Sequence, residues 1–359
     1  MLLAGALSAC SHTAIAPPVQ TGLVYRDASG TFVLASLGGA DPHPLGGATQ
    51  ALLAPNGSLV AALGGGSTGA LTIYHIATTK RAHTVSLTRV VARVAAHLRP
   101  PQWSAAHIQL LAWSPDSRLV ALTADSISAG GEQSELLVLD TTNDTLRTIA
   151  AGNFFGASFA PVLPDRLVYA DATLAQLDAN VVPLFTANAN GSARREITGS
   201  GLDAEPAWGA KGIVFARLGR LGSASRSPRY QLWLIQPNGR GLRKLTHIVA
   251  GPPAPNSAGA ALSLSANGAR VVANFSSPYL AFHAIDVWTV NLALARPVAH
   301  RLTFDGAQFI AQGLSRNGSR ILLSALDADG QQTDVESLPW AGEPQAVLVS
   351  AGADPSWNG

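Results

Sequence analysis

The residue types that most often do chemistry are scattered along this 359-residue chain and form no complete motif. No two of its nine histidines have the i, i+2 or i, i+4 spacing of a metal-binding pair. Gly156-Ala-Ser158 comes nearest to the G-x-S-x-G turn of a nucleophilic serine, yet it lies in a segment with the pattern of a strand. Asp327, Asp329 and Asp334 share one loop, but the distal glutamate of a calcium-binding loop is missing. We therefore expect no catalytic residue, no metal and no other cofactor.

Cys10, the single cysteine, stands where its thiol has a chemical meaning. It follows an apolar stretch that ends in Leu7-Ser-Ala, and this order resembles the bacterial lipobox. In that motif, small residues let the signal peptidase reach the backbone, and the thiol forms a thioether with a diacylglyceryl group. The motif implies a signal peptide over residues 1–9 and a lipidated Cys10 with a flexible tether over residues 10–21. It also implies a lipid-anchored protein outside the cytoplasm.

Two predicted loops carry arginine and aromatic residues, the side-chain types that most often anchor protein interfaces. Both loops, over residues 217–229 and 274–285, should share one face with two further long loops over residues 125–134 and 171–180. The candidate partner-binding residues are Arg217, Arg220, Arg226 and Arg229 in the first loop and Phe275, Tyr279 and Phe282 in the second. Each loop has a simpler alternative, which is a solvated hairpin for the arginines and packing against the domain for the aromatic residues.

A repeated turn indicates the elements that would position these loops. A short apolar strand, a tight polar turn and a second apolar strand recur along the chain. Asn-Gly pairs form four of the turns, because a tight hairpin needs positive φ at its centre and these residues adopt it at low steric cost. The seven turns lie at residues 56–57, 116–117, 163–165, 210–211, 267–268, 317–318 and 358–359.

Each turn begins a unit of roughly 40–60 residues with four short strands, which is the pattern of a propeller blade. The chain begins with an apparent second and third strand, at residues 23–25 and 32–36, and it ends one strand into a unit. We therefore predict an all-β fold, a seven-bladed β-propeller over residues 22–359 with four-stranded antiparallel blades. One blade would be closed by both termini, which removes an open sheet edge.

Composition is consistent with this fold and excludes other classes of protein. Hydrophobic residues make up 47% of the chain and charged residues 13%, which excludes a disordered chain. The net charge of +2 gives no reason to expect nucleic acid as a partner. After the first ten residues, no apolar stretch has the length of about 18 residues that a membrane-spanning helix needs.

Three stretches, at residues 113–117, 230–246 and 301–306, resemble the repeat of TolB-type (WD-like) propellers. Together with the lipobox, they make the chain similar to the propeller part of LpqB-type lipoproteins, although the domain that precedes the propeller in that family has no room here. Peptidases that carry this type of propeller need an additional α/β-hydrolase domain, and no residues remain to build one.

These patterns together predict a membrane-anchored, extracytoplasmic lipoprotein. Its propeller, a monomer, would be a non-enzymatic scaffold that binds another protein of the cell envelope. The alternative is a propeller enzyme, or a protein that binds a carbohydrate or another small ligand at the mouth of the channel. The polarity of the channel separates the two hypotheses, since convergent carboxylates or histidines there would favour chemistry.

Overall fold

Strands dominate the computed structural model. It describes residues 22–36, 42–64, 70–76, 80–87, 107–128, 131–219, 229–248, 250–255, 260–277, 284–302, 308–327, 331–340 and 347–357. Within these ranges the single α-helix is α2 (Leu174–Asp178). Cys10 and the predicted tether lie outside the described residues.

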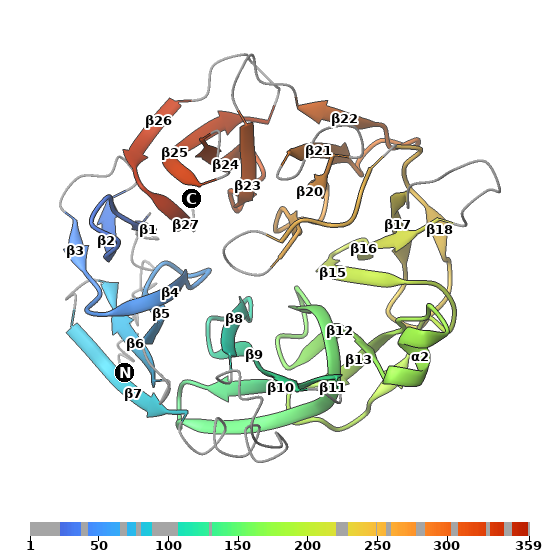
Figure 1. Ribbon diagram of the computed structural model, residues 1–359, viewed down its shortest axis with the longest axis horizontal. Helices are drawn as coiled ribbons and strands as arrows, with labels where there is room; N and C mark the ends of the chain where they lie inside the picture. The colour runs from blue at the N-terminus through green and yellow to red at the C-terminus, as the bar shows by residue number, and fades with distance from the viewer. Residues whose placement is uncertain are drawn as a thin grey trace, which may run out of the picture.

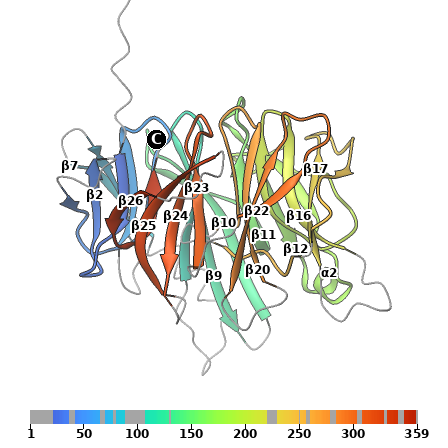
Figure 2. The same cartoon turned by 90° about the horizontal axis from the view of Figure 1, so that it is seen from above.

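The sheets follow one another around a central axis in chain order, from blue to red in Figure 1. Seen from the side, their strands run roughly along that axis (Figure 2). The described strands form five sheets of four strands and one sheet of seven, and neighbouring strands pair antiparallel. Blades arranged in this way are a β-propeller, so the predicted all-β propeller fold is confirmed, while the exact count of seven blades stays a prediction.

The first strand of the described chain shares a sheet with the last. β1 pairs with β2 on one side, through Leu23 and Ala35, and with β27 on the other, through Leu23 and Trp357. The order from the axis outward is β27 (Ala353–Trp357), β1 (Gly22–Arg26), β2 (Phe32–Ser36) and β3 (His43–Pro44). Both ends of the described chain are therefore held by backbone hydrogen bonds in one blade.

The other four-stranded sheets repeat this order, with the strand nearest the axis first. The second contains β4 (Ala48–Leu53), β5 (Leu59–Gly64), β6 (Ala70–His75) and β7 (Lys80–Ser86). The next two contain β15 (Asp203–Gly209), β16 (Gly212–Leu218), β17 (Tyr230–Ile235) and β18 (Arg243–Lys244), then β19 (Leu262–Leu264), β20 (Arg270–Ser276), β21 (Ile285–Asn291) and β22 (Ala299–Leu302). The last contains β23 (Gln308–Leu314), β24 (Arg320–Leu326), β25 (Gln332–Pro339) and β26 (Val347–Ala351).

One long strand, β11 (Thr145–Phe159), belongs to two blades. Its first part pairs with β10 (Gly131–Asp140) and its second part with β12 (Arg166–Ala172). It is thus the outer strand of one blade and the inner strand of the next, and the seven-stranded sheet consists of two joined blades. The remaining strands of this sheet are β8 (His107–Trp113), β9 (Leu119–Ser128), β13 (Leu184–Asn188) and β14 (Arg195–Glu196).

The tight turns between inner and second strands have the geometry that the Asn-Gly pairs predict. Gly57, Gly268 and Gly318 have φ of +68°, +63° and +71°, the left-handed region that glycine adopts without steric cost. In the first of these turns, Asn56 Oδ1 also accepts the N–H of Ser58 at 2.8 Å. These local contacts fix the register of the two strands that each turn joins.

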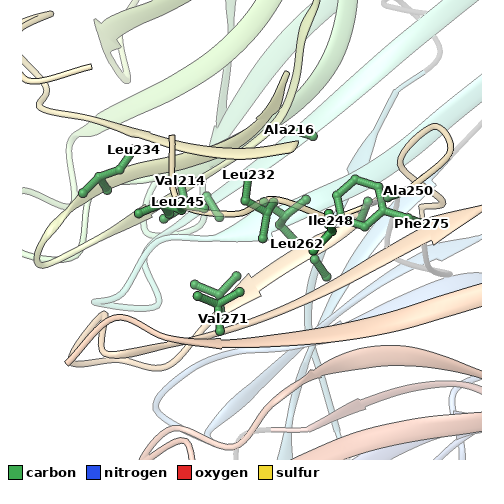
Figure 3. Close-up of a cluster of buried hydrophobic side chains, with 14 of the residues drawn as sticks. Val214, Ala216, Leu232, Leu234, Leu245, Ile248, Ala250, Leu262, Val271 and Phe275 are labelled. Atoms are coloured by element: carbon green, nitrogen blue, oxygen red, sulfur yellow. The ribbon is translucent and has the colours of Figure 1, made fainter. Parts of the chain in front are cut away.

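The core lies between the faces of neighbouring blades. Figure 3 shows one such layer, in which Val214 and Leu232 of one blade pack against Leu262 and Val271 of the next. Phe275 lies in the same cluster and is fully buried. Burial of apolar surface between blades stabilises the ring, because each sheet removes the apolar face of its neighbour from water.

Two of the predicted long loops are regular structure instead. Residues 125–134 mostly extend β9 and β10, which pair as far as Ser128 and Gly131. Residues 171–180 contain the end of β12 and helix α2, whose N-terminus is capped by the Thr173 side chain. Both stretches were expected to be long loops between a second and a third strand, but extended strand pairing forms most of the first and a capped helix forms half of the second.

Candidate functional site

Arg217 does not lie on a partner surface, because the fold buries it beside an acid. Its Nε and Nη2 donate to the two carboxylate oxygens of Asp203 at 2.5 and 2.7 Å. Arg217 is 8% exposed, and its guanidinium carbon lies 5.2 Å from the ring centre of Phe215. Burial raises the pKa of the Asp203 carboxyl, and Arg217 opposes that rise. This ion pair removes Arg217 from the predicted binding set.

Phe275 is also removed, since it is part of the core between two blades (Figure 3). For this residue the packing alternative holds. Arg229 is exposed just before β17 and stays a candidate. The other predicted anchors, Arg220, Arg226, Tyr279 and Phe282, lie outside the described residues, so their role stays a prediction.

The inner strands of four consecutive blades line a cavity of about 200 Å³ beside the propeller axis, called here the axial cavity. Its walls come from β8, β11, β15 and the segment around β19. Most of the lining residues are apolar, but polar atoms supply more than half of the surface that faces the cavity, and the side chains of Ser158, Glu205 and Ser263 are among the polar groups. Pockets for whole drug-sized ligands measure roughly 300–1,000 Å³, so this cavity fits a small chemical group.

Glu205 enters the axial cavity from a strained point of β15. Its φ is +54°, in the left-handed region, and Pro206 follows it. The pairing of β15 with β16 shifts at this point, and such a bulge redirects a side chain. Gly156 of the preceding blade makes the room, since a Cβ there would lie 3.0 Å from Glu205 Cα. The glycine of Gly156-Ala-Ser158 therefore serves a close approach of two blades.

One oxygen of the Glu205 carboxylate is held, and the other has no partner in the described structure. Oε2 accepts the N–H of Ala261, from the next blade, at 2.9 Å. Glu205 is 9% exposed, and burial raises the pKa of its carboxyl to about 7, a rise that the Ala261 N–H opposes. A carboxyl with a pKa near neutral pH, inside a cavity, can bind a ligand or transfer a proton.

The two serines of the axial cavity join one blade to the next. Ser158 Oγ accepts the N–H of Trp208 at 3.1 Å, and Ser263 Oγ accepts the N–H of Leu314 at 3.2 Å. The same kind of bond joins Gln50 to Leu110 and Asn274 to Ala311. Glu205 shares this structural role through Oε2 and differs in keeping an oxygen for other contacts.

A second recess, called here the rim groove, lies between the outer parts of the β15–β18 and β19–β22 blades and measures about 500 Å³. Leu245, Ile248 and Trp288 form apolar surface in it, and Val298 stands 51% exposed at its side. The indole Nε1 of Trp288 is buried without a hydrogen-bond partner. Its lining also contains an ion pair, in which Arg301 donates to Asp286 Oδ1 at 2.5 and 3.0 Å.

The two segments that border the rim groove are basic. Residues 240–248 and 293–302 contain no acidic residue. Their basic residues are Arg240, Arg243, Lys244, His247, Arg296, His300 and Arg301, all exposed. Asp286, on β21, is already bound by Arg301, so the surface beside the groove is positively charged.

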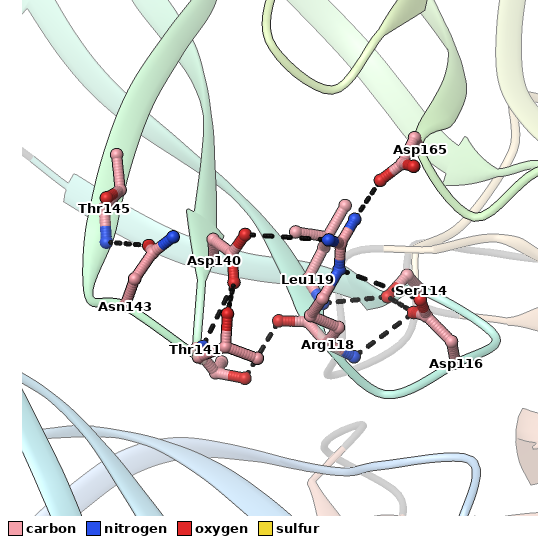
Figure 4. A network of polar contacts seen from close by, with 10 residues as sticks. Ser114, Asp116, Arg118, Leu119, Asp140, Thr141, Asn143, Thr145 and Asp165 are labelled. Carbon is pink, nitrogen blue, oxygen red and sulfur yellow. Dashed lines mark hydrogen bonds and ion pairs between the residues drawn. The ribbon is translucent and has the colours of Figure 1, made fainter.

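A third polar cluster surrounds Arg118 in the turn that follows β8 (Figure 4). Its guanidinium lies near Asp116 and Asp140 of its own blade and contacts Asp165, in the corresponding turn of the next blade. Ser114 Oγ accepts the N–H of Leu119 at 2.8 Å and closes the turn. The cluster connects two turns through one arginine and three carboxylates.

Within the described ranges, no three His, Cys, Asp or Glu side chains gather into a group that could hold a metal ion. No helix in the same part of the chain has the length and apolar character needed to cross a membrane.

No known protein-family model matches the chain, and no curated protein matches it. Among solved structures, the β-propeller domain of the Trilobed protease from Pyrococcus furiosus is 11% identical, with a TM-score of 0.58 over 89% of each chain. Oligogalacturonate lyase from Vibrio parahaemolyticus is 10% identical, with a TM-score of 0.56 over 86% of this chain and 92% of that one. TolB from Acinetobacter baumannii is 16% identical, with a TM-score of 0.45 over 94% of this chain and 66% of that one. The first two of these similarities show a shared β-propeller fold.

Sequence reasoning missed Glu205, although a signal for it was present. The order acid, proline, small residue, tryptophan occurs twice, at residues 205–208 and 354–357, and both times in an inner strand. The acid of each copy has positive φ, which is costly outside glycine and often marks a functional position. The repetition of an acid before proline in a predicted inner strand was therefore the sequence signal for the axial cavity.

Proposed function

We propose that the chain is an extracytoplasmic lipoprotein, held at the bacterial membrane through Cys10. We further propose that its propeller is a non-enzymatic scaffold for another protein of the cell envelope. The observation that carries the proposal is the rim groove with its basic borders. Its occupant would be an extended segment of the partner that combines acidic and apolar side chains.

Charge and shape both support such an occupant. Arg243, Lys244 and Arg296 stand exposed beside the groove, so acidic side chains of a partner would meet opposite charge and associate faster. Val298, which is 51% exposed, and Pro297 offer apolar surface at a recess of about 500 Å³, which suits side chains rather than a flat membrane. Tryptophan and arginine, the residue types of Trp288 and Arg301, are those most enriched among interface anchors.

Backbone pairing is a further contribution available at this place. β22 is the outermost strand of its sheet and pairs with β21 alone among the described strands. Its free edge presents N–H and C=O groups to which an extended segment can add as another strand.

The axial cavity supports binding rather than bond cleavage as the work of this propeller. Its two serine hydroxyls are engaged with backbone N–H groups of the next blade. Glu205 is the single titratable side chain among the described residues that line it. Acid–base chemistry of the usual kind relies on two groups with opposite roles.

Charge reversal tests the rim groove. The full chain with Arg243→Glu and Lys244→Glu should fold normally and recover its envelope partner from detergent-solubilised membranes at least about tenfold less well than the wild type. A matched control carries Arg147→Glu and Arg316→Glu, two exposed arginines on other blades, and should retain the partner. A third variant, Arg220→Ala with Arg226→Ala and Tyr279→Ala, tests the loop residues that the sequence suggested.

The proposal fails if the groove variant keeps the partner, and loss in the loop variant alone would assign binding to the loops instead. Vesicles with anionic lipid are tested beside the protein partner. If the groove variant loses vesicle binding and keeps the protein, the basic surface serves the membrane.

Replacement of Cys10 by serine tests the anchor. A diacylglyceryl group supplies two acyl chains, which hold a protein firmly where one chain binds only marginally. Cys10→Ser should therefore release the protein from the membrane fraction or leave the uncleaved precursor, as seen by fractionation and mass spectrometry. Unchanged membrane retention with the mature mass of the wild type would contradict the lipobox.

A further inference from the structure

The axial cavity contains an acid that the architecture of the blades does not fully use. Glu205 Oε2 makes the blade-to-blade bond to Ala261, as other polar side chains of the inner strands do. Oε1 has no partner in the described structure, although Glu205 is 91% buried (9% exposed). Buried charged groups are nearly always paired, because an unpaired one costs several kcal/mol or gives up its charge. Oε1 is therefore free to accept a hydrogen bond from a group inside the axial cavity.

We propose that the axial cavity binds a primary ammonium group carried on a short apolar stem, with Glu205 Oε1 as its counter-ion. The inference does not rest on the partner of the rim groove, which lies at the outer part of the propeller.

The number of free oxygens favours ammonium over other cations. A guanidinium binds best to both oxygens of a carboxylate, and Oε2 is already occupied by the Ala261 N–H. A calcium ion takes six to eight oxygen ligands, whereas the side chains lining this cavity supply one free carboxylate oxygen and two hydroxyls. An ammonium is a compact charge with three donors, so one carboxylate oxygen and nearby hydroxyls suffice.

The serines complete the set of acceptors. Ser158 and Ser263 each accept one backbone N–H, and a hydroxyl oxygen has two lone pairs. Each can therefore accept a second hydrogen bond from a group inside the cavity. Burial raises the pKa of Glu205 to about 7, because the charged carboxylate is poorly solvated in the cavity. A cation that binds beside Oε1 stabilises the charged form, so the burial of Glu205 favours a cationic ligand.

The walls define the rest of the ligand. Leu111, Leu262 and Leu264 line the cavity, so a stem of a few methylene groups gains from leaving water. The volume of about 200 Å³ leaves no room for a large molecule. The ammonium would belong to a small aliphatic amine or to the amino terminus of a peptide, which share this chemistry.

Calorimetry on the full chain at pH 8 tests the site with n-butylamine as the probe and n-butanol as its neutral counterpart. We expect n-butylamine to bind with a Kd below about 10 mM and n-butanol to show no measurable heat. Glu205→Gln keeps the size of the side chain and an acceptor for Ala261, and it should weaken n-butylamine binding at least about tenfold. Asp354→Asn, in the matching strand, should leave it unchanged.

A second measurement does not depend on how the variant folds. In wild-type protein, the amide signal of Ala261 should shift on addition of n-butylamine and stay in place with n-butanol. Ala-Leu-Ala with a free amino terminus, compared with its N-acetylated form, identifies the source. Tighter binding of the free tripeptide than of n-butylamine assigns the site to a peptide, and binding of n-butylamine alone assigns it to a small amine. Equal binding of butylamine and butanol, or equal affinity in Glu205→Gln, overturns the proposal.

Discussion

Two inner strands of the propeller share a local sequence and differ in what surrounds it. Residues 205–208 of β15 and 354–357 of β27 each run acid, proline, small residue, tryptophan. The two acids have φ of +54° and +51°, and each lies where the pairing with the second strand shifts. The backbone of both segments is therefore set by the same local pattern.

The partners of the two acids are different. Asp354 Oδ2 lies 2.8 Å from Arg26 Nη2, and Oδ1 accepts from Gln332 Nε2 at 3.0 Å. Among the described residues, the Glu205 carboxylate has a single hydrogen-bond partner, the Ala261 N–H. The comparison teaches that local sequence fixes the bulge, while side chains from other strands decide whether its acid is neutralised or left to act.

The two segments also differ two residues before the acid, and substitution there should have the largest effect on stability. Asp203 precedes Glu205 and forms its buried ion pair with Arg217, whereas Gly352 precedes Asp354, where a Cβ would lie 2.7 Å from the Tyr25 ring. Arg217→Ala leaves the Asp203 charge buried without its counter-ion, so it should lower the free energy of unfolding by about 3–5 kcal/mol. Urea unfolding followed by circular dichroism measures the loss.

Arg26→Ala is the matched control, since it removes the arginine partner of the other acid. The Arg26 side chain is 45% exposed, so this ion pair is screened by water and should contribute at most about 1 kcal/mol. A smaller loss for Arg217→Ala than for Arg26→Ala would contradict the view that the β15 segment depends on a buried pair.

The sequence predicted best what short-range contacts decide. The Asn-Gly turns, such as Asn56-Gly57, adopt positive φ whatever lies around them, so the strands beside them could be located. The double role of β11 could not be predicted. The strand is continuous in sequence, and its two halves differ only in the strands with which they pair, β10 and β12. Arg217 and Phe275 were assigned to a surface for the same reason: their burial depends on strands distant in the sequence.

The axial cavity and the rim groove were beyond prediction for a related reason. Each is assembled from separate blades, and the residues of a single blade do not reveal it. The sequence did contain the basic residues at 240–248 and 293–302, but only the rim groove, which residues of both segments line, makes them one surface. Placement of the loops at residues 220–228 and 278–283 stays a prediction.

A pH titration of stability sharpens the contrast between the two acids. Because burial raises the pKa of Glu205 to about 7 in the folded protein, from an ordinary value of 4.5, the folded state holds this proton more tightly. Its contribution is fully present below about pH 4.5 and is lost as the pH rises to about 7. Glu205→Gln removes this loss, so the variant should equal the wild type at pH 4 and exceed it by up to about 3 kcal/mol at pH 8.

Asp354→Asn is the matched substitution in β27, and its effect should be smaller and of opposite sign. Asp354→Asn replaces an acid whose carboxylate is held by Arg26 and Gln332, so it removes a favourable interaction. Glu205→Gln, in contrast, removes a carboxylate whose burial is unfavourable. The Asp354 side chain is 17% exposed beside a half-exposed arginine, and we expect a loss of at most about 1 kcal/mol at pH 8. Urea unfolding at pH 8 measures the change in the free energy of unfolding for both variants. Stabilisation by both substitutions would mean that the two carboxylates experience the same environment, and the distinction between the two bulges would be lost.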